Sequence, residues 1–165
     1  MNGPLQVIAA PSVAALPDVV GRSATGHWFT VSQDRIDQFA DATADHQWIH
    51  VDPVRAAAGP FGATVAHGFL TLSLVPALTD GLLAVEGAAM VVNYGLDKVR
   101  FVSPVRAGSR VRATTTVVGV EPTPAGTRVL SDVVVDLEGA DKPAVVARTI
   151  TLVVPAPPPP AGPAR

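Results

Sequence analysis

The chain contains no cysteine and few aromatic residues. Without cysteine, its 165 residues cannot form a disulfide, a thiolate metal site or a Cys nucleophile. Aromatic residues make up 5% of the chain although hydrophobic residues make up 48%, so Val, Leu, Ile and Ala must fill the core. A valine-rich composition favours β-sheet, and the length is that of one domain.

The sequence also has no excess of basic residues and no long apolar run. The formal net charge is −2, and the Arg residues are scattered, so nucleic acid is not an expected partner. No apolar run reaches the ~18–20 residues that would cross a membrane. No Lys or Arg precedes Arg22, so the N-terminal segment does not have the pattern of a signal peptide. These absences predict a cytoplasmic protein that does not bind membranes.

Composition divides the chain into three parts. Residues 1–17 are interrupted by Ala and Pro and have no sustained period, which predicts a loosely ordered leader. Residues 155–165 are rich in proline, which removes backbone donors, and so predict a disordered tail. Residues 18–154 remain as a single domain.

Three helices are expected in the first half. Ser32 can cap a helix at roughly 33–42, and Asp52-Pro53 can begin a short one that ends at Gly59-Pro60. The run 65–78 is apolar on almost every face, which predicts a buried helix that Pro76 kinks or ends. A loop framed by the first two helices then holds Asp45 and His50.

The second half has the composition of β-strands separated by short turns. Consecutive strands joined by short turns form an antiparallel sheet. Together with one fully apolar helix, such a sheet predicts an α+β hot-dog fold, in which a curved antiparallel sheet wraps around a buried central helix. The expected strands are 27–31, 91–94, 98–102, 110–120, 127–137 and 144–154, with residues 95–97 dividing the second from the third.

Asp45, His50 and Gly68 are the candidate catalytic residues. A carboxylate and an imidazole close together can bind and polarise one water molecule. Gly68 stands near the start of the apolar helix, where a free N–H can stabilise an anion and the lack of a side chain allows close approach. This combination suits chemistry on a carbonyl compound.

Several motifs in order give the chain a family resemblance. They are DHQWIHVDP at 45–53, Phe61-Gly62, AHGFL at 66–70 with Ser73 after it, and NYGLDKVRF at 93–101 followed by Pro104-Val105. This series resembles the MaoC-like dehydratases, which include the (R)-specific enoyl-CoA hydratases, over residues 20–154. Many members have Asn-Pro where this chain has Gln47-Trp48, so Trp48 would mark a subgroup with its own substrate range.

The resemblance implies a homodimer that adds water to trans-2-enoyl-CoA and gives (R)-3-hydroxyacyl-CoA, with no cofactor and no metal. It implies that Asp45 and His50 hold the catalytic water. The expected substrate is an acyl-CoA or, alternatively, an acyl group on acyl carrier protein. Further candidates for substrate binding are Ser73, His67, Trp48, Phe69 and Arg100.

Each candidate also has a structural interpretation. Gly68 could be a packing glycine, and the Ser73 hydroxyl could simply bond a carbonyl one turn back. His67 could support its neighbours, Arg100 could form an ion pair instead of lying near CoA phosphates, and Asp52 is expected to be a helix cap. The residue types leave these alternatives open.

Other functions fit parts of the pattern. His46, His50 and His67 with two Asp residues could form a metal site, but a spacing of four brings His46 and His50 together only on a helix, which Trp48-Ile49 and Asp52-Pro53 oppose. A hot-dog acyl-CoA thioesterase would direct water at the carbonyl carbon. A catalytically silent acyl-binding subunit is the third alternative, and the presence of both Asp45 and His50 counts against it.

Overall fold

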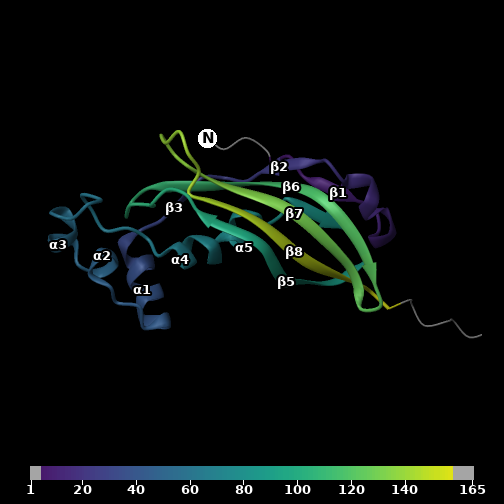
Figure 1. Cartoon of the computed structure of the whole chain (residues 1–165). Coiled ribbons are helices and arrows are strands. Elements are labelled where there is room, and N and C mark those ends of the chain that lie inside the picture. The colour runs from purple at the N-terminus through teal and green to yellow at the C-terminus, as the bar shows by residue number, and fades with distance from the viewer. Residues whose placement is uncertain (1–4, 158–165) are drawn as a thin grey trace, which may run out of the picture.

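A long, curved antiparallel sheet dominates the computed structural model, which describes residues 5–157 (Figure 1). Strands β6 (Arg110–Thr123), β7 (Gly126–Leu137) and β8 (Val145–Pro155) follow one another in space as in sequence. The last three expected strands are therefore confirmed with small shifts at their ends. Pro155, expected in the tail, ends β8, and residues 158–165 of that tail lie outside the described residues.

Both edges of the sheet are formed by strands from earlier in the chain. The sheet order is β2-β6-β7-β8-β5, with β2 at Ser23–Thr25 and with β3 (Phe29–Thr30) also paired to β6. The expected strand at 27–31 is thus shorter, and β2 is a strand that was not predicted. Strand β5 (Ala88–Phe101) forms the opposite edge beside β8.

Strand β5 corrects one expectation. Residues 91–94 and 98–102 were expected as two strands, but they belong to one strand of 14 residues that runs through Gly95, Leu96 and Asp97. Its register against β8 shifts between Asn93 and Gly95 and again between Leu96 and Lys98. Such irregularities let a strand accommodate extra residues and bend without ending, so the Gly-Leu-Asp segment bends the strand and does not form a turn.

The helices within residues 33–57 gather at one end of the sheet (Figure 1). Helix α1 (Gln33–Thr43) begins as expected, because the Ser32 hydroxyl accepts the Arg35 N–H. Helix α3 (Pro53–Ala57) is capped by Asp52, whose carboxylate accepts the Arg55 N–H. Between them lies a one-turn helix, α2 (Trp48–Val51), so His50 is on helical backbone and not on an open loop.

The central helix is shorter than expected. Residues 65–67 are extended, and helical structure starts at α4 (Gly68–Ser73) and resumes in α5 (Val75–Leu78), near whose start Pro76 lies. The two pieces lie beneath the sheet (Figure 1). Leu70, Thr71, Val75 and Leu78 are buried. Phe69 is 68% exposed, so the expectation of burial on every face is wrong for the single chain.

The inward face of the sheet covers two separate apolar clusters. One joins Ile36, Leu70 and Leu78 to the Val-rich ends of the strands nearest α1. The other collects Leu16 and Leu82 with Val117, Val129 and Val153 at the opposite end. The core is therefore divided along the length of the sheet.

The second cluster corrects the expectation of a loosely ordered leader for the described part of residues 1–17, and residues 1–4 lie outside the described residues. Residues 8–10 form β1 (Ile8–Ala10), which pairs in parallel with β4 (Leu83–Val85), and a 3-10 helix, η1, spans Val13–Val19. Ile8 and Leu16 are almost fully buried. Burial against β4 and the sheet orders this segment although its proline-containing sequence has no period of its own.

Candidate active site

Asp45 follows a helix end with unusual backbone geometry. Helix α1 stops at Thr43, and its cap Ala44 is left-handed with φ 58°. The N–H groups of Ala44 and Asp45 both bond the Ala40 carbonyl. A left-handed cap is usual for Gly but costs free energy for Ala. This sharp exit turns the Asp45 carboxylate away from the helix while leaving it more than half exposed.

The His50 ring is held in one tautomer by the backbone. Its Nδ1 lies 2.6 Å from the carbonyl oxygen of Val65, which can only accept, so Nδ1 carries the hydrogen. Nε2 is then the nitrogen with the free lone pair. Because the His50 side chain is buried, its ring has a fixed orientation. The lone pair on Nε2 therefore has a fixed direction and can accept a proton from water.

His67 links the two other groups. Its ring stacks on that of His50, with centroids 3.7 Å apart and an interplanar angle of 25°. Its Nε2 donates to the backbone carbonyl of Asp45 at 2.8 Å and lies 4.0 Å from the Asp45 carboxylate. Its Nδ1 is buried and has no hydrogen-bond partner among the described residues.

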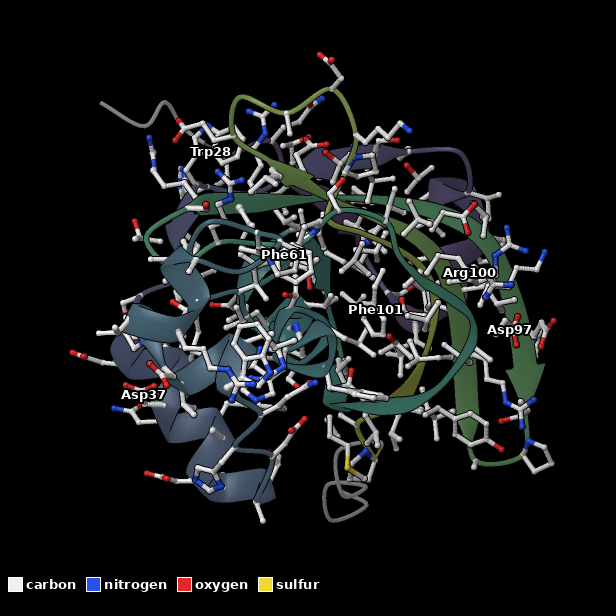
Figure 2. The ribbon with its side chains drawn as sticks, turned by 60° about the vertical axis from the view of Figure 1, so that its left-hand side comes forward. Trp28, Asp37, Phe61, Asp97, Arg100 and Phe101 are labelled. Carbon is white, nitrogen blue, oxygen red and sulfur yellow. The ribbon has the colours of Figure 1, made fainter. Side chains whose placement is uncertain are left out.

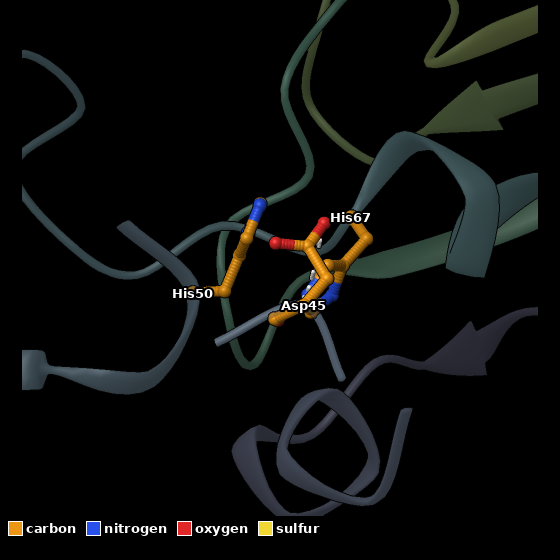
Figure 3. A group of neighbouring side chains, drawn as sticks. All are labelled: Asp45, His50 and His67. Atoms are coloured by element: carbon orange, nitrogen blue, oxygen red, sulfur yellow. Dashed lines mark hydrogen bonds and ion pairs between the residues drawn. The ribbon is translucent and has the colours of Figure 1, made fainter. Parts of the chain in front are cut away.

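The three side chains converge although they come from separate segments (Figure 3). One ligand-capable atom each of Asp45, His50 and His67 lies within 4.8 Å of the other two. Two groups at that separation can share one water molecule through hydrogen bonds of about 2.8 Å each. An arrangement of this size has room for a water molecule between Asp45 and His50, and their role in catalysis stays a prediction.

The electrostatic environment keeps His50 neutral. Burial is the largest cause that lowers the pKa of His50 below its ordinary 6.5, and the nearby His67 lowers it further. The hydrogen bond to Val65 and the charge of Asp45 act in the opposite direction without cancelling the effect of burial. A neutral imidazole with a free Nε2 is the form that a general base needs.

Gly68 directly follows His67 and begins α4. As the first residue of a helix, it has an N–H with no acceptor inside that helix. A Cβ at this position would lie 2.9–3.1 Å from ring atoms of Phe101. The packing interpretation of Gly68 is thus supported by contact. Because α4 has only six residues, anion stabilisation here would come from the local N–H and not from a long helix dipole.

The other candidate substrate residues do not join this group. The Ser73 hydroxyl donates to the Phe69 carbonyl at 2.7 Å, which is the structural alternative named above. Phe69 packs edge-on against Phe101, near Gly68. The Trp48 ring stacks on the guanidinium of Arg55 and leaves no room for a side chain at Gly59.

Arg100 lies elsewhere. It is near Asp97, on the opposite side of the molecule from Asp37 on helix α1 (Figure 2). It lines a shallow cavity with Lys98, Asp132 and Arg148. Its guanidinium donates only to the neighbouring Val99 carbonyl among the described residues. The structure does not bring Arg100 to Asp45 and His50.

The sequence analysis missed two residues that support the site, Gln33 and Thr64. The Gln33 side-chain amide donates to the His50 carbonyl at 2.8 Å and to Asp37 at 2.7 Å, while its oxygen accepts the Thr64 hydroxyl. Gln33 thereby ties the start of α1 to α2 and to the segment before His67. An amide in the first turn of a helix carries no local signal of this role.

The structure changes the set of residues that could form a metal site. His46 bonds Asp41 at 2.8 Å, and Asp52 caps α3, so neither belongs to the group. Asp45, His50 and His67 remain as possible ligands. Each imidazole already uses one nitrogen on a backbone carbonyl. The expectation that no metal is needed stays a prediction.

The curved antiparallel sheet and the short helices beneath it define a class of protein, the hot-dog proteins. Solved structures agree on the fold. The R-hydratase PhaJ1 from Pseudomonas aeruginosa superposes with a TM-score of 0.70 at 24% identity, covering 93% of this chain and 96% of that one. A monoamine oxidase regulatory protein from Archaeoglobus gives 0.73 at 24% identity, covering 92% and 99%.

Sequence comparison gives the family. The model described as "MaoC like domain" matches residues 17–137. The chain is 53% identical over 142 residues to 3-hydroxyacyl-thioester dehydratase Z of Mycobacterium tuberculosis, covering 86% of this chain and 92% of the relative. It is 46% identical over 146 residues to nodulation protein N of Rhizobium leguminosarum bv. viciae, covering 86% and 91%. The chain belongs to the MaoC-like dehydratases and is a hydro-lyase.

Among residues 5–157, no helix combines the length and the apolar character that crossing a bilayer would require.

Proposed function

We propose that this enzyme hydrates trans-2-enoyl thioesters reversibly and (R)-specifically, with CoA as the carrier and acyl carrier protein as the alternative. The observation that carries the proposal is the convergence of Asp45 and His50 within 4.8 Å of each other and of His67, the residue that directly precedes Gly68. The name of the mycobacterial relative, a 3-hydroxyacyl-thioester dehydratase, supports the same substrate class. We propose the cytoplasm as its location, in keeping with the composition.

In the proposed mechanism, Asp45 and His50 hold one water molecule opposite C3 of the substrate. His50 Nε2 takes a proton from this water while its oxygen forms a bond to C3. The electrons of the C2–C3 double bond move toward the thioester oxygen, where the Gly68 N–H stabilises the charge. A proton from the Asp45–His50 pair then reaches C2 on the same face, so that the net change is the addition of one water.

His67 is a positioning residue in this mechanism. The His67 ring stacks on that of His50, and its Nε2–H donates to the backbone carbonyl of Asp45. Gly68 is the next residue in the chain. One residue thus fixes the relative positions of the three catalytic groups. A displacement of even ~1 Å among such groups can cost about 100-fold in rate.

The unpaired edge of the sheet supports a homodimer. Strand β5 pairs only with β8 among the described strands, and it exposes a row of large apolar side chains. Native proteins rarely leave such an edge open. We propose that two copies pair through β5 around a two-fold axis. The exposed residues are Met90, Val91, Val92, Tyr94, Leu96 and Phe101.

The test of the activity uses matched pairs of variants. Asp45→Asn and His50→Gln should each lower the rate of loss of enoyl-thioester absorbance by about 100-fold or more. Asp41→Asn and His46→Gln, which alter a neighbouring Asp–His contact outside the site, should leave it unchanged. Chiral analysis of the product checks the (R) configuration. Full activity of either site variant would remove that residue from the mechanism, and release of free thiol from saturated acyl-CoA would indicate a thioesterase.

A further inference from the structure

Between the two apolar clusters, the inward face of the sheet carries hydroxyl groups. Inward positions on β6 are Val111, Ala113, Thr115 and Val117, so Thr115 interrupts an otherwise aliphatic series. On β7 the corresponding interruption is Ser131, between Val129 and Val133.

Strand β8 and strand β5 continue the same interruption. Ser131 is paired directly with Thr149, and Thr151 is paired with Asn93. Together with Thr115, these residues form a diagonal polar row across four neighbouring strands. A single polar residue on this face of a sheet is common, but five that lie along one diagonal over four neighbouring strands mark one place on the sheet.

A cavity of about 430 Å³ lies at this place. The polar row lines one side, and Val75, Pro76 and Leu83 line the other. A second cavity of about 270 Å³ adjoins it, since both are lined by Val75, Pro76, Asn93 and Thr149, and it extends to Leu72 and Ser73 on α4. The cavities therefore follow the helices that begin at Gly68.

Two of the hydroxyl groups belong to largely buried residues that line the cavity. Thr115 is 7% exposed and Ser131 is 8% exposed, and both border the cavity, where their hydroxyls can meet water or an occupant. A plain alkyl chain in this cavity would separate both hydroxyls from water without replacing the lost hydrogen bonds.

From these observations we infer that the cavity accepts the distal part of a long acyl chain that carries a hydroxyl or oxo group. The inference deepens the proposed function, because it assumes that the thioester lies at Gly68. Val75 is seven residues beyond Gly68, a distance of roughly 10 Å along the helices at 1.5 Å per residue. The oxygen substituent is therefore several carbons away from the reacting double bond. Asp80 also lines the cavity, and its carboxylate disfavours an anionic substituent.

The test compares two long-chain trans-2-enoyl-CoA substrates of equal length, one plain and one with a distal hydroxyl group. The wild-type enzyme should favour the hydroxylated chain in kcat/KM. The double variant Thr115→Val with Ser131→Ala should reverse this preference by about fivefold or more, the factor that one net hydrogen bond supplies. The matched control Thr116→Val alters the next residue of β6, on the opposite face, and should keep the wild-type preference.

Crotonyl-CoA separates this inference from the proposed function. Its acyl chain is too short to reach the polar row, so the wild type and the double variant should hydrate it equally well. If wild type does not hydrate crotonyl-CoA or any long enoyl-CoA, the proposed function fails. If wild type hydrates both long chains but prefers the plain one, and the double variant leaves that preference unchanged, the polar row binds only water and the inference is overturned. Circular dichroism of the double variant confirms its folding.

Discussion

The ring of His50 owes its chemistry to its surroundings. Its Nδ1 hydrogen is held by the Val65 carbonyl, its face is covered by His67, and its backbone carbonyl is held by Gln33. All three contacting residues lie more than ten positions from His50 in the sequence, so only folding brings them to it. The sequence could identify His50 as a candidate, but the fixed tautomer is a property of the folded chain.

The pH dependence of the reaction should show the lowered pKa of His50. Because burial lowers that pKa below 6.5, His50 stays neutral and able to accept a proton down to a lower pH than a free imidazole. We expect the acidic limb of the kcat/KM profile to lie below pH 6.5, measured with a short enoyl-CoA. A limb at or above this pH would contradict the assignment of His50 as the base.

The same shift affects stability with a definite sign. A group that is harder to protonate when folded binds fewer protons in the native state than in the unfolded state, so its contribution to stability falls as pH falls. For His50 this loss begins near pH 6.5 and continues downward to its lowered folded pKa. Denaturant unfolding of wild type and His50→Gln over this range should show the loss only in the wild type.

Substitution of Gly68 distinguishes packing from catalysis. The methyl group of Gly68→Ala would lie 2.9–3.1 Å from Cγ and Cδ atoms of the Phe101 ring, so the ring would have to shift. Stability should therefore fall, and kcat/KM should fall by about 10-fold to 100-fold because the thioester can no longer approach the backbone.

The control for this prediction adds Phe101→Ala to Gly68→Ala. If the activity loss comes from obstruction of the thioester, the double variant stays impaired relative to Phe101→Ala alone. Recovery to the level of Phe101→Ala would mean that Gly68 serves only to accommodate the ring.

At the level of elements, helix α1 ends in a strained cap that exposes Asp45. Ala44 is the only non-glycine residue with positive φ among the described residues. Gly at this position should relieve the strain and raise the free energy of unfolding by up to about 1 kcal/mol. For a chain of this size, that corresponds to a rise in Tm of about 2–4 °C. Calorimetry of Ala44→Gly checks the prediction, and an unchanged or lower Tm would contradict it.

Long elements with a clear period were predictable, and short elements were not. The alternation of Val111, Ala113 and Val117 on β6 follows from the sequence, since a strand of that length must bury one face. Strand β1 and helix η1 have too few residues to show a period, and contact with β4 orders them. The bends in β5 depend on its partner β8, which lies far along the chain.

The candidate site was predictable in part for the same reason. Asp45, His50 and Gly68 carry chemistry that their residue types reveal. His67 stacks on His50 from 17 positions away, and Gln33 reaches His50 from the same distance on the other side. Such contacts depend on tertiary structure and have no local signature, so the supporting residues could not be assigned.

For the whole molecule, the exposed face of β5 predicts self-association. Val92→Lys places a charge in the proposed interface and should shift the protein toward monomer, because a charge at a strand edge opposes edge pairing. Val54→Lys is the matched control, since Val54 is 86% exposed on α3, away from the sheet edge. Sedimentation of both variants and wild type checks this, and a monomeric wild type would contradict it.

The divided interior has a consequence for how this protein responds to occupancy. A sheet with valine at every inward position could close over one continuous apolar core, whereas here the polar row keeps the two clusters apart. An occupant that matches the row would bridge the clusters and complete the interior that the polypeptide alone leaves open. The free enzyme is then the less stable form. Binding of a fitting substrate analogue should make the molecule more compact and raise its Tm.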